Sequence, residues 1–285
     1  MGFVKILYWK YNLLIIKSVN RKDVIQLAIN PVKLKKYTNY SSILTSLPHS
    51  SYNLTLEMKK SIKENVILAN NDWYLNELYD FLTNLNITSI SANYSRYVID
   101  VNRKPEYKDN HEKYTESLVY FKTTFNKEIY DKPLQSDVIE NRIEKIYKPY
   151  HSCLLNEISN ILNNKNKVYL FDLHSFYHQS TADVVLGTRY GKTCSKEFLD
   201  IVYNAFVNEG FSVKVDEIGL RGGYITYHYS SIENVEAIQI EIRYTKYIEN
   251  RYFDEEFMPK INYELFNDTK NRLNRVFSAI KEKLD

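Results

Sequence analysis

The sequence contains very little glycine. Only 7 of its 285 residues are glycine, and six of these fall between positions 187 and 223. The six are Gly187, Gly191, Gly210, Gly219, Gly222 and Gly223. A chain this poor in glycine uses it mainly where the backbone takes a positive φ or approaches another group closely. The cluster therefore predicts constrained loops in this stretch, without indicating what they contact.

Cysteine is scarcer still, and the net charge is small. Cys153 and Cys194 show neither CxxC spacing nor the density of a disulfide-stabilised domain, so we expect reduced thiols and a cytoplasmic protein. The 38 basic and 35 acidic side chains are interspersed, giving a formal charge of only +3. The sequence therefore lacks the basic stripe of a nucleic-acid-binding protein.

Internal repeats and Pro/Gly/Ser-rich linkers are also missing. We therefore predict one domain over residues 1–285, in which the packing of residues 1–40 is uncertain. The apolar stretch at the start fits either a strand-forming core segment or a loosely attached leader. Lys10 and Lys17 interrupt it, no small-residue cleavage site follows, and it is too short to span a bilayer. We expect no membrane association.

Strand and helix patterns alternate along the chain. Period-two or buried apolar runs predict strands within residues 42–48, 87–94, 97–103, 167–175, 211–217 and 236–243. Apolar residues at three- and four-residue spacing predict helices within residues 72–85, 137–163, 194–210 and 255–284. This alternation indicates an α/β fold whose sheet is covered on both faces. Ligands of such sheets usually bind beyond the carboxyl ends of the strands.

Three polar residues that fall at element ends are candidate metal ligands. His49 follows the first of these strands, His174 ends the run "VYLFDLHS", and Asp72 begins a predicted helix. Two histidines and one carboxylate are a common ligand set for a catalytic zinc with one open position. Taken singly, each residue also fits a structural role, a hydrogen-bonded histidine or a helix N-cap. Their spacing matches no short metal motif, so the residues alone leave both interpretations open.

The segment "SRYVIDVNR" carries two of only ten arginines in the chain, Arg96 and Arg103. Arginine offers a fixed fork that matches a carboxylate, whereas lysine is a mobile point charge. Arg103 beside Asn102 suits a substrate carboxylate, since one supplies a bidentate fork and the other an amide donor. An internal ion pair between Asp100 and an arginine explains the pattern equally well.

Two further segments carry candidate residues. The strand "AIQIEIR" places Gln239, Glu241 and Arg243 on one face, and Glu241 there could act as general base for a water. A solvent-exposed strand face fits the same alternation. The segment "YKPYH" places His151 on or near the packed side of a helix, where a core histidine is the favoured interpretation.

Taken in order, eight segments resemble the N-formylglutamate amidohydrolase family. They are "PHSS", Asp72, "SRYVIDVNR", "YKPYH", "FDLHSF", "DVVLGTRYG", "GLRGGYITYHY" and "AIQIEIR", spread from about Ser42 to Tyr247. No single segment is decisive, but eight in the same order with compatible gaps are specific. The resemblance therefore favours a functional site over the separate structural interpretations.

The resemblance implies a phosphorylase/hydrolase-like α/β fold with three αβα layers and a mixed central sheet, related to zinc carboxypeptidases. It implies one zinc ion held by His49, Asp72 and His174, although such a set can hold other divalent ions. Asp172 lies two residues before His174 on the same strand face, so it could orient that imidazole.

The resemblance also implies roles for other residues. Glu241 would be the general base, and Arg96 would join it as a catalytic group. Arg96, Asn102 and Arg103 would hold substrate carboxylates or the developing oxyanion. His151 and Arg221 would lie in the pocket wall. The chain departs from the family pattern at Ser51, where glycine is usual, and at Lys148, where histidine is frequent.

The implied reaction is hydrolysis of the amide of a small N-acyl amino acid, with N-formyl-L-glutamate as the leading substrate. The expected partner is therefore a small molecule with a carboxylate, and the sequence does not decide between a monomer and a homo-oligomer. Two alternatives stay open. A zinc hydrolase of this fold could act on peptides or cell-wall fragments, because a fold does not fix a substrate. A non-catalytic binding protein is the other.

Overall fold

The computed structural model describes residues 27–37, 39–106 and 117–285. The expectations for the N-terminal stretch therefore lie largely outside the described residues. Within the described ranges, no helix combines the length and the apolar character that crossing a membrane requires.

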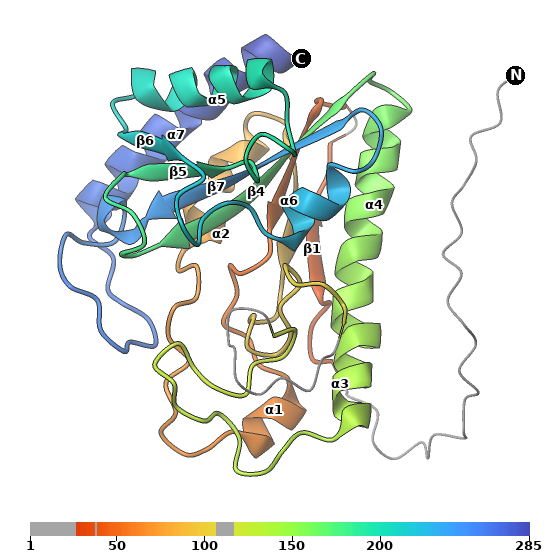
Figure 1. The fold of residues 1–285 in the computed structure, drawn as a ribbon, viewed down its shortest axis with the longest axis vertical. Helices are drawn as coiled ribbons and strands as arrows, with labels where there is room; N and C mark the ends of the chain where they lie inside the picture. Colours follow the sequence, from red (N-terminus) through yellow and green to blue (C-terminus); the bar gives the residue numbers. More distant parts are fainter. Residues whose placement is uncertain (1–26, 38, 107–116) are drawn as a thin grey trace, which may run out of the picture.

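A mixed β-sheet forms the centre of the molecule (Figure 1). In the part of the chain that the structure describes, it has seven strands in the order β1-β3-β2-β4-β7-β5-β6. They are β1 (Val32–Lys35), β2 (Ile43–Leu47), β3 (Thr88–Ala92), β4 (Val168–Phe176), β5 (Val184–Gly187), β6 (Val213–Val215) and β7 (Val235–Arg243). β1 is antiparallel to β3 and β5 to β7, while the other neighbours are parallel. The predicted mixed sheet is confirmed.

Helices cover both faces of this sheet and complete the predicted three layers. α4 (Lys148–Leu162) and α6 (Tyr224–Tyr229) share one apolar core with the β4 residue Leu170. α5 (Lys196–Asn208) and α7 (Tyr263–Leu284) share a second core with the next β4 residue, Phe171. Because consecutive side chains of a strand point to opposite faces, one buried run supplies both cores. Figure 1 shows α4 on one side of the sheet and α5 with α7 on the other.

The predicted helices differ from the observed ones at their ends. Residues 72–85 form only α2 (Leu75–Leu78) and the 3₁₀ turn η1 (Asp80–Thr83), after the short helix α1 (Leu56–Ser61). The last helix starts at residue 263 instead of 255, where the side chain of Asn262 accepts a hydrogen bond from the backbone N–H of Leu265. Such an N-cap is a stronger local start signal than the apolar pattern that precedes it.

The long helical pattern of residues 137–163 contains an irregularity. It consists of α3 (Ser136–Arg142), a π-helical stretch η3 (Ile143–Tyr147) and α4. Pro149 lies in the first turn of α4 and has no backbone N–H to donate to the preceding turn. A single wide turn before such a proline lets the chain stay helical.

The strand predicted over residues 97–103 is absent. The segment is instead a series of turns, although Tyr97, Val98 and Val101 are buried as a strand pattern requires. The fully buried guanidinium of Arg142 donates to the carbonyl of Val98 at 2.8 Å and to Glu57 at 2.8 Å. The alternating apolar pattern of residues 97–103 therefore reflects burial on two sides of a loop. The segment does not pair with any neighbouring strand that the structure describes.

We expect Phe277→Ala in α7 to destabilise the whole protein. Phe277 is fully buried, and its ring lies 5.4 Å from that of Phe171 in β4. Removing such a ring costs about 3–5 kcal/mol of unfolding free energy. Denaturant unfolding would show this as one transition shifted to lower concentration if residues 27–285 behave as a single domain. The exposed substitution Glu282→Ala in the same helix is the control, and two separate transitions would contradict the single-domain prediction.

Candidate active site

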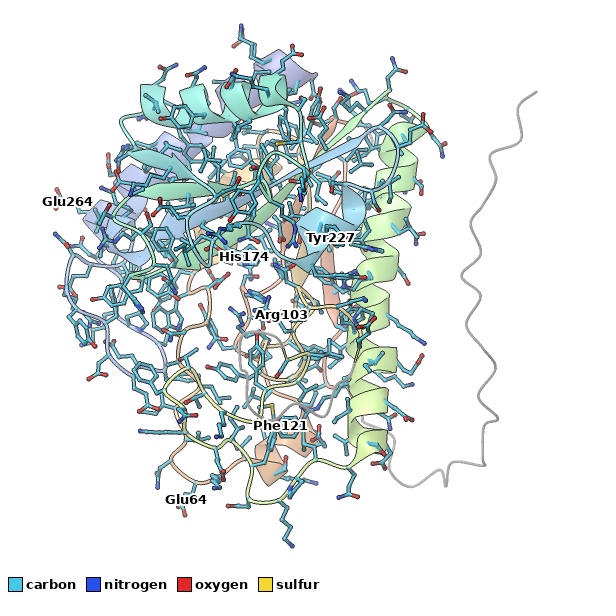
Figure 2. All side chains as sticks on the ribbon, in the orientation of Figure 1. Glu64, Arg103, Phe121, His174, Tyr227 and Glu264 are labelled. Carbon is cyan, nitrogen blue, oxygen red and sulfur yellow. The ribbon has the colours of Figure 1, made fainter. Side chains whose placement is uncertain are left out.

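A cavity of about 440 Å³ opens at the carboxyl ends of β2, β4 and β7. Its lining comprises His49, Asp72, Arg96, Asn102, Arg103, His174, Ser175, Phe176, Gln179, Gly219, Leu220, Gly222, Gly223, Gln239 and Glu241. Figure 2 labels two of these residues, His174 at the strand ends and Arg103 in the loops facing them, both near the middle of the molecule. The sheet therefore presents its polar strand ends to a cavity, as expected for ligand binding in this fold class.

The structure brings the three predicted metal ligands together. One ligand atom each of His49, Asp72 and His174 lies within 4.8 Å of the others, and all three residues are buried. Asp72 does not cap a helix, because α2 starts three residues later with Tyr74 at its N-cap. Parallel pairing of β2 with β4 brings the loop that carries His49 beside His174. The N-cap interpretation of Asp72 is therefore wrong.

Both imidazoles turn the same nitrogen toward this group. His174 Nδ1 lies 2.9 Å from Asp72 Oδ2, and His49 Nδ1 lies 3.5 Å from the same oxygen but forms no hydrogen bond within the described residues. The Nε2 atoms point the opposite way, that of His49 to Asp100 at 2.6 Å and that of His174 to Asp172 at 2.8 Å. A carboxylate behind an imidazole fixes its orientation and raises its basicity as a ligand. The two nitrogens and one carboxylate oxygen are a donor set that suits zinc.

The pKa values of Asp72 and His174 are both shifted far from their ordinary range. Burial disfavours the ionised form of Asp72, yet the hydrogen bond with His174 and the His49 imidazole 3.5 Å away hold the pKa of its carboxyl below the ordinary range. Burial likewise disfavours the His174 imidazolium, but the carboxylates of Asp172 and Asp72 hold the pKa of His174 well above its usual value. Positive charge is thus favoured between these carboxylates, which is the property that a cation site needs.

Glu241 has the opposite electrostatic environment. Burial raises the pKa of its carboxyl to about 8, and no group in the described ranges forms a hydrogen bond with its Oε2 atom. Its Oε1 atom accepts a hydrogen bond from Gln239 Nε2 at 2.8 Å. In the parallel β4–β7 pair, Glu241 lies directly beside His174. Both faces of β7 are buried, so the solvent-face interpretation of Gln239 and Glu241 is wrong.

The structure shows the internal ion pair of the arginine segment, and the contact with a substrate carboxylate stays a prediction. Asp100 is fully buried and accepts hydrogen bonds from Arg96 Nη2 at 3.0 Å and from the hydroxyl of Tyr120. Its ion pair with Arg96 is the internal pair that the sequence suggested as an alternative. Arg96 and Arg103 nevertheless line the cavity, so the same arginines face both Asp100 and the ligand space. Tyr120 gave no signal in the sequence, because an apolar run with one tyrosine looks like ordinary core.

Asn102 lines the cavity, but its amide group already has partners. Its Nδ2 donates to Asp172 Oδ2 at 3.0 Å, and its Oδ1 accepts from the backbone N–H of Ile225 at 2.8 Å. Nδ2 also lies 3.0 Å from His174 Nε2. The amide therefore braces the Asp172–His174 pair, a contact that differs from the predicted one with a substrate carboxylate.

His151 and Arg221 do not line the cavity. His151 lies between the hydroxyl of Tyr229 and the carbonyl of Val101, at 2.9 Å from each, and burial lowers its pKa to about 4. It is a hydrogen-bonded core histidine, as the residue pattern by itself suggested. The guanidinium of Arg221 stacks on the exposed ring of Tyr190 and donates to the carbonyl of Asp216. Their placement in the pocket wall is therefore not observed.

Comparison with known proteins agrees with this architecture. The N-formylglutamate amidohydrolase family profile matches residues 41–248. The N-formylglutamate deformylase of Pseudomonas putida is 28% identical over 219 residues, which cover 73% of this chain and 82% of that protein. Its counterpart from Pseudomonas aeruginosa is 29% identical over 224 residues, covering 73% and 83%.

Solved structures show the same fold. The N-formylglutamate amidohydrolase from Ralstonia eutropha JMP134 superposes with a TM-score of 0.77 at 22% identity, over 90% of this chain and 99% of that one. A gene product from Agrobacterium tumefaciens reaches a TM-score of 0.67 at 15% identity, over 90% and 93%. The profile match covers most of the chain and confirms the resemblance found in the sequence motifs. The chain belongs to the N-formylglutamate amidohydrolase family, whose members hydrolyse an amide bond.

Proposed function

We propose that this protein is a zinc-dependent amidohydrolase that converts N-formyl-L-glutamate and water to L-glutamate and formate. The observation that carries the proposal is the buried group of His49, Asp72 and His174 beside the unpartnered Oε2 atom of Glu241. The names of the Pseudomonas relatives supply the substrate. The cavity of about 440 Å³ has ample room for a molecule of this size.

The zinc ligands in this proposal are His49 and His174, each through Nδ1, and Asp72 through a carboxylate oxygen. The buried, unpartnered Nδ1 of His49 supports this, since a buried polar atom normally has a partner. When bound, zinc polarises an amide carbonyl and lowers the pKa of an adjacent water toward about 7. Asp100 and Asp172 keep the two imidazoles in the orientation that presents Nδ1.

Glu241 moves the protons in this proposal. Its Oε2 atom accepts a proton from the attacking water and then delivers it to the departing amine of glutamate. Burial places the pKa of this carboxyl at about 8, close to neutral pH, where one group can both accept and return a proton. The C–N bond of the formamide breaks as the amine takes up that proton, and the formyl carbon leaves as formate.

The two arginines stabilise negative charge at different places. Arg96 is proposed to face the oxyanion of the tetrahedral intermediate, because its guanidinium already lies 3.8 Å from Asp72. Arg103 is proposed to bind a substrate carboxylate, since its side chain lines the cavity and retains 24% exposure. Asn102 is assigned a supporting role through its bonds to Asp172 and Ile225.

A formate-release assay tests the proposal directly. Purified protein loaded with stoichiometric zinc is expected to release formate from N-formyl-L-glutamate. N-acetyl-L-glutamate and peptides with C-terminal glutamate serve as comparison substrates. Peptide cleavage without formate release would support the peptidase alternative, and bound zinc without hydrolysis of any of these amides would support a binding protein.

We expect Glu241→Gln to keep zinc and the fold but to lower kcat by about 10²–10⁴-fold, because the amide cannot accept the proton. Steady-state kinetics, elemental analysis for zinc and circular dichroism check the three parts of this expectation. A kcat within a few-fold of the unsubstituted enzyme would remove Glu241 as the base.

We expect His174→Ala to lose its zinc, since one of three protein ligands disappears and Asp72 loses its imidazole partner. Elemental mass spectrometry after extensive dialysis measures the metal content. The matched control is His178→Ala, which removes an exposed histidine four residues away and should retain the metal. Stoichiometric zinc in the His174 variant would eliminate this residue as a ligand.

We expect Arg103→Met to raise KM for N-formyl-L-glutamate by about 10- to 100-fold, the effect of losing one charged hydrogen-bonded contact. Its effect on kcat should be smaller than that of Arg96→Met, which removes charge from the reacting centre. Arg275→Met, which removes a surface arginine paired with Glu209, is the control. An unchanged KM in the Arg103 variant would place the substrate carboxylate elsewhere.

A further inference from the structure

We infer that Gln239 is a positioning residue for Glu241, and that the glycine-rich loop at residues 219–223 holds Gln239 in place. The inference rests on the proposed role of Glu241 as base. Gln239 is buried and bridges two groups: its Nε2 donates to Glu241 Oε1 at 2.8 Å, and its Oε1 accepts from the backbone N–H of Gly223 at 2.8 Å. The bridge occupies one carboxylate oxygen of Glu241 and leaves the other, Oε2, without a partner at the cavity.

The loop determines which end of the Gln239 amide faces Glu241. A backbone N–H can only donate, so the N–H of Gly223 must meet the amide oxygen. The amide nitrogen then has to point at Glu241, where its N–H group donates to the carboxylate and stabilises the ionised form. The backbone N–H of Gly223 thus sets the orientation of the Gln239 amide, and that orientation gives Glu241 a hydrogen-bond donor.

Close backbone approach fixes the loop itself. Gly187 is the register partner of Gln239 in the β5–β7 pair, and a Cβ at Gly187 would lie 2.5 Å from the backbone nitrogen of Gly222. A Cβ at Gly223 would overlap the side chain of Asn102, and Gly222 has a φ of +104°. Larger residues at these positions would lift the loop from the strand ends. The clustered glycines of this glycine-poor chain therefore support the Gln239 bridge.

Without the bridge, Glu241 keeps its place on β7 but loses the contact that selects its side-chain rotamer. A carboxylate that turns by one rotamer no longer presents Oε2 to the reacting atoms, and misplacement by about 1 Å can cost 10²-fold in rate. Since Gln239 also lines the cavity, a direct substrate contact is the competing explanation for any loss of activity.

Two substitutions at position 239 separate these roles. Gln239→Leu removes both hydrogen bonds, whereas Gln239→Glu keeps an acceptor for the N–H of Gly223 and, at a pH where both carboxyls are ionised, removes the donor to Glu241. Both are expected to lower kcat by about 10- to 100-fold with KM changed less than threefold and zinc content unchanged. A raised KM with unchanged kcat would show a substrate contact instead. Full activity of the Gln239→Glu variant at that pH would show that anchoring the loop is the only role.

A double-mutant cycle supplies the decisive measurement. In the Glu241→Gln background, Gln239→Leu is expected to cost less than threefold, because the base that it positions is gone. Gln179→Leu is the matched control: among the described residues, this second cavity glutamine bonds only to the backbone of its own turn, so its effect should be additive with Glu241→Gln. Additive losses for Gln239→Leu would overturn the inference. Absence of formate release by the unsubstituted enzyme would instead refute the proposed function.

Discussion

Two buried carboxylates, Asp100 and Asp172, hold the imidazoles on which the site depends. Each accepts from an Nε2 atom and so turns Nδ1 toward the cavity. Burying two carboxylates costs several kcal/mol unless other donors satisfy their remaining lone pairs. Arg96, Tyr120 and the backbone N–H of Asn102 do this at Asp100. The candidate metal ligands and the cavity arginines therefore share one hydrogen-bonded network and cannot shift independently.

Two carboxyl groups of the cavity, those of Asp72 and Glu241, have pKa values that their surroundings shift in opposite directions. The hydrogen bond with His174 and the nearby His49 imidazole outweigh the burial of Asp72 and favour its ionised form. Glu241 has a single amide donor, and burial dominates, so its proton affinity is raised. Residues of the same chemical type thus suit different tasks, one as a ligand and the other in proton transfer. The segment that precedes α2 supplies one environment, and strand β7 supplies the other.

The sequence predicted the layers of this fold more successfully than its irregular parts. The buried run of β4 and the alternation of β7 are local patterns, so the strands that carry His174 and Glu241 could be identified. The assembly of His49, Asp72 and His174 depends on strand order, which no local pattern contains, and only the family resemblance indicated it. For His151 the residue pattern favoured the core position that is observed, whereas the resemblance implied the pocket wall. Residues 97–103 were misassigned because burial on both sides of a loop imitates a strand.

That misassigned segment has a consequence for how the site moves. Residues 97–103 do not pair with any of the described strands, yet hydrogen bonds hold them in place. The buried Arg142 donates to the backbone carbonyl of Val98, and Arg96 donates to the buried Asp100. The amides of such a stretch open to solvent only when a larger cooperative unit opens with them. Slow deuterium uptake would therefore accompany an irregular backbone here. The arginines would meet an arriving carboxylate already ordered, and binding would cost little further side-chain entropy.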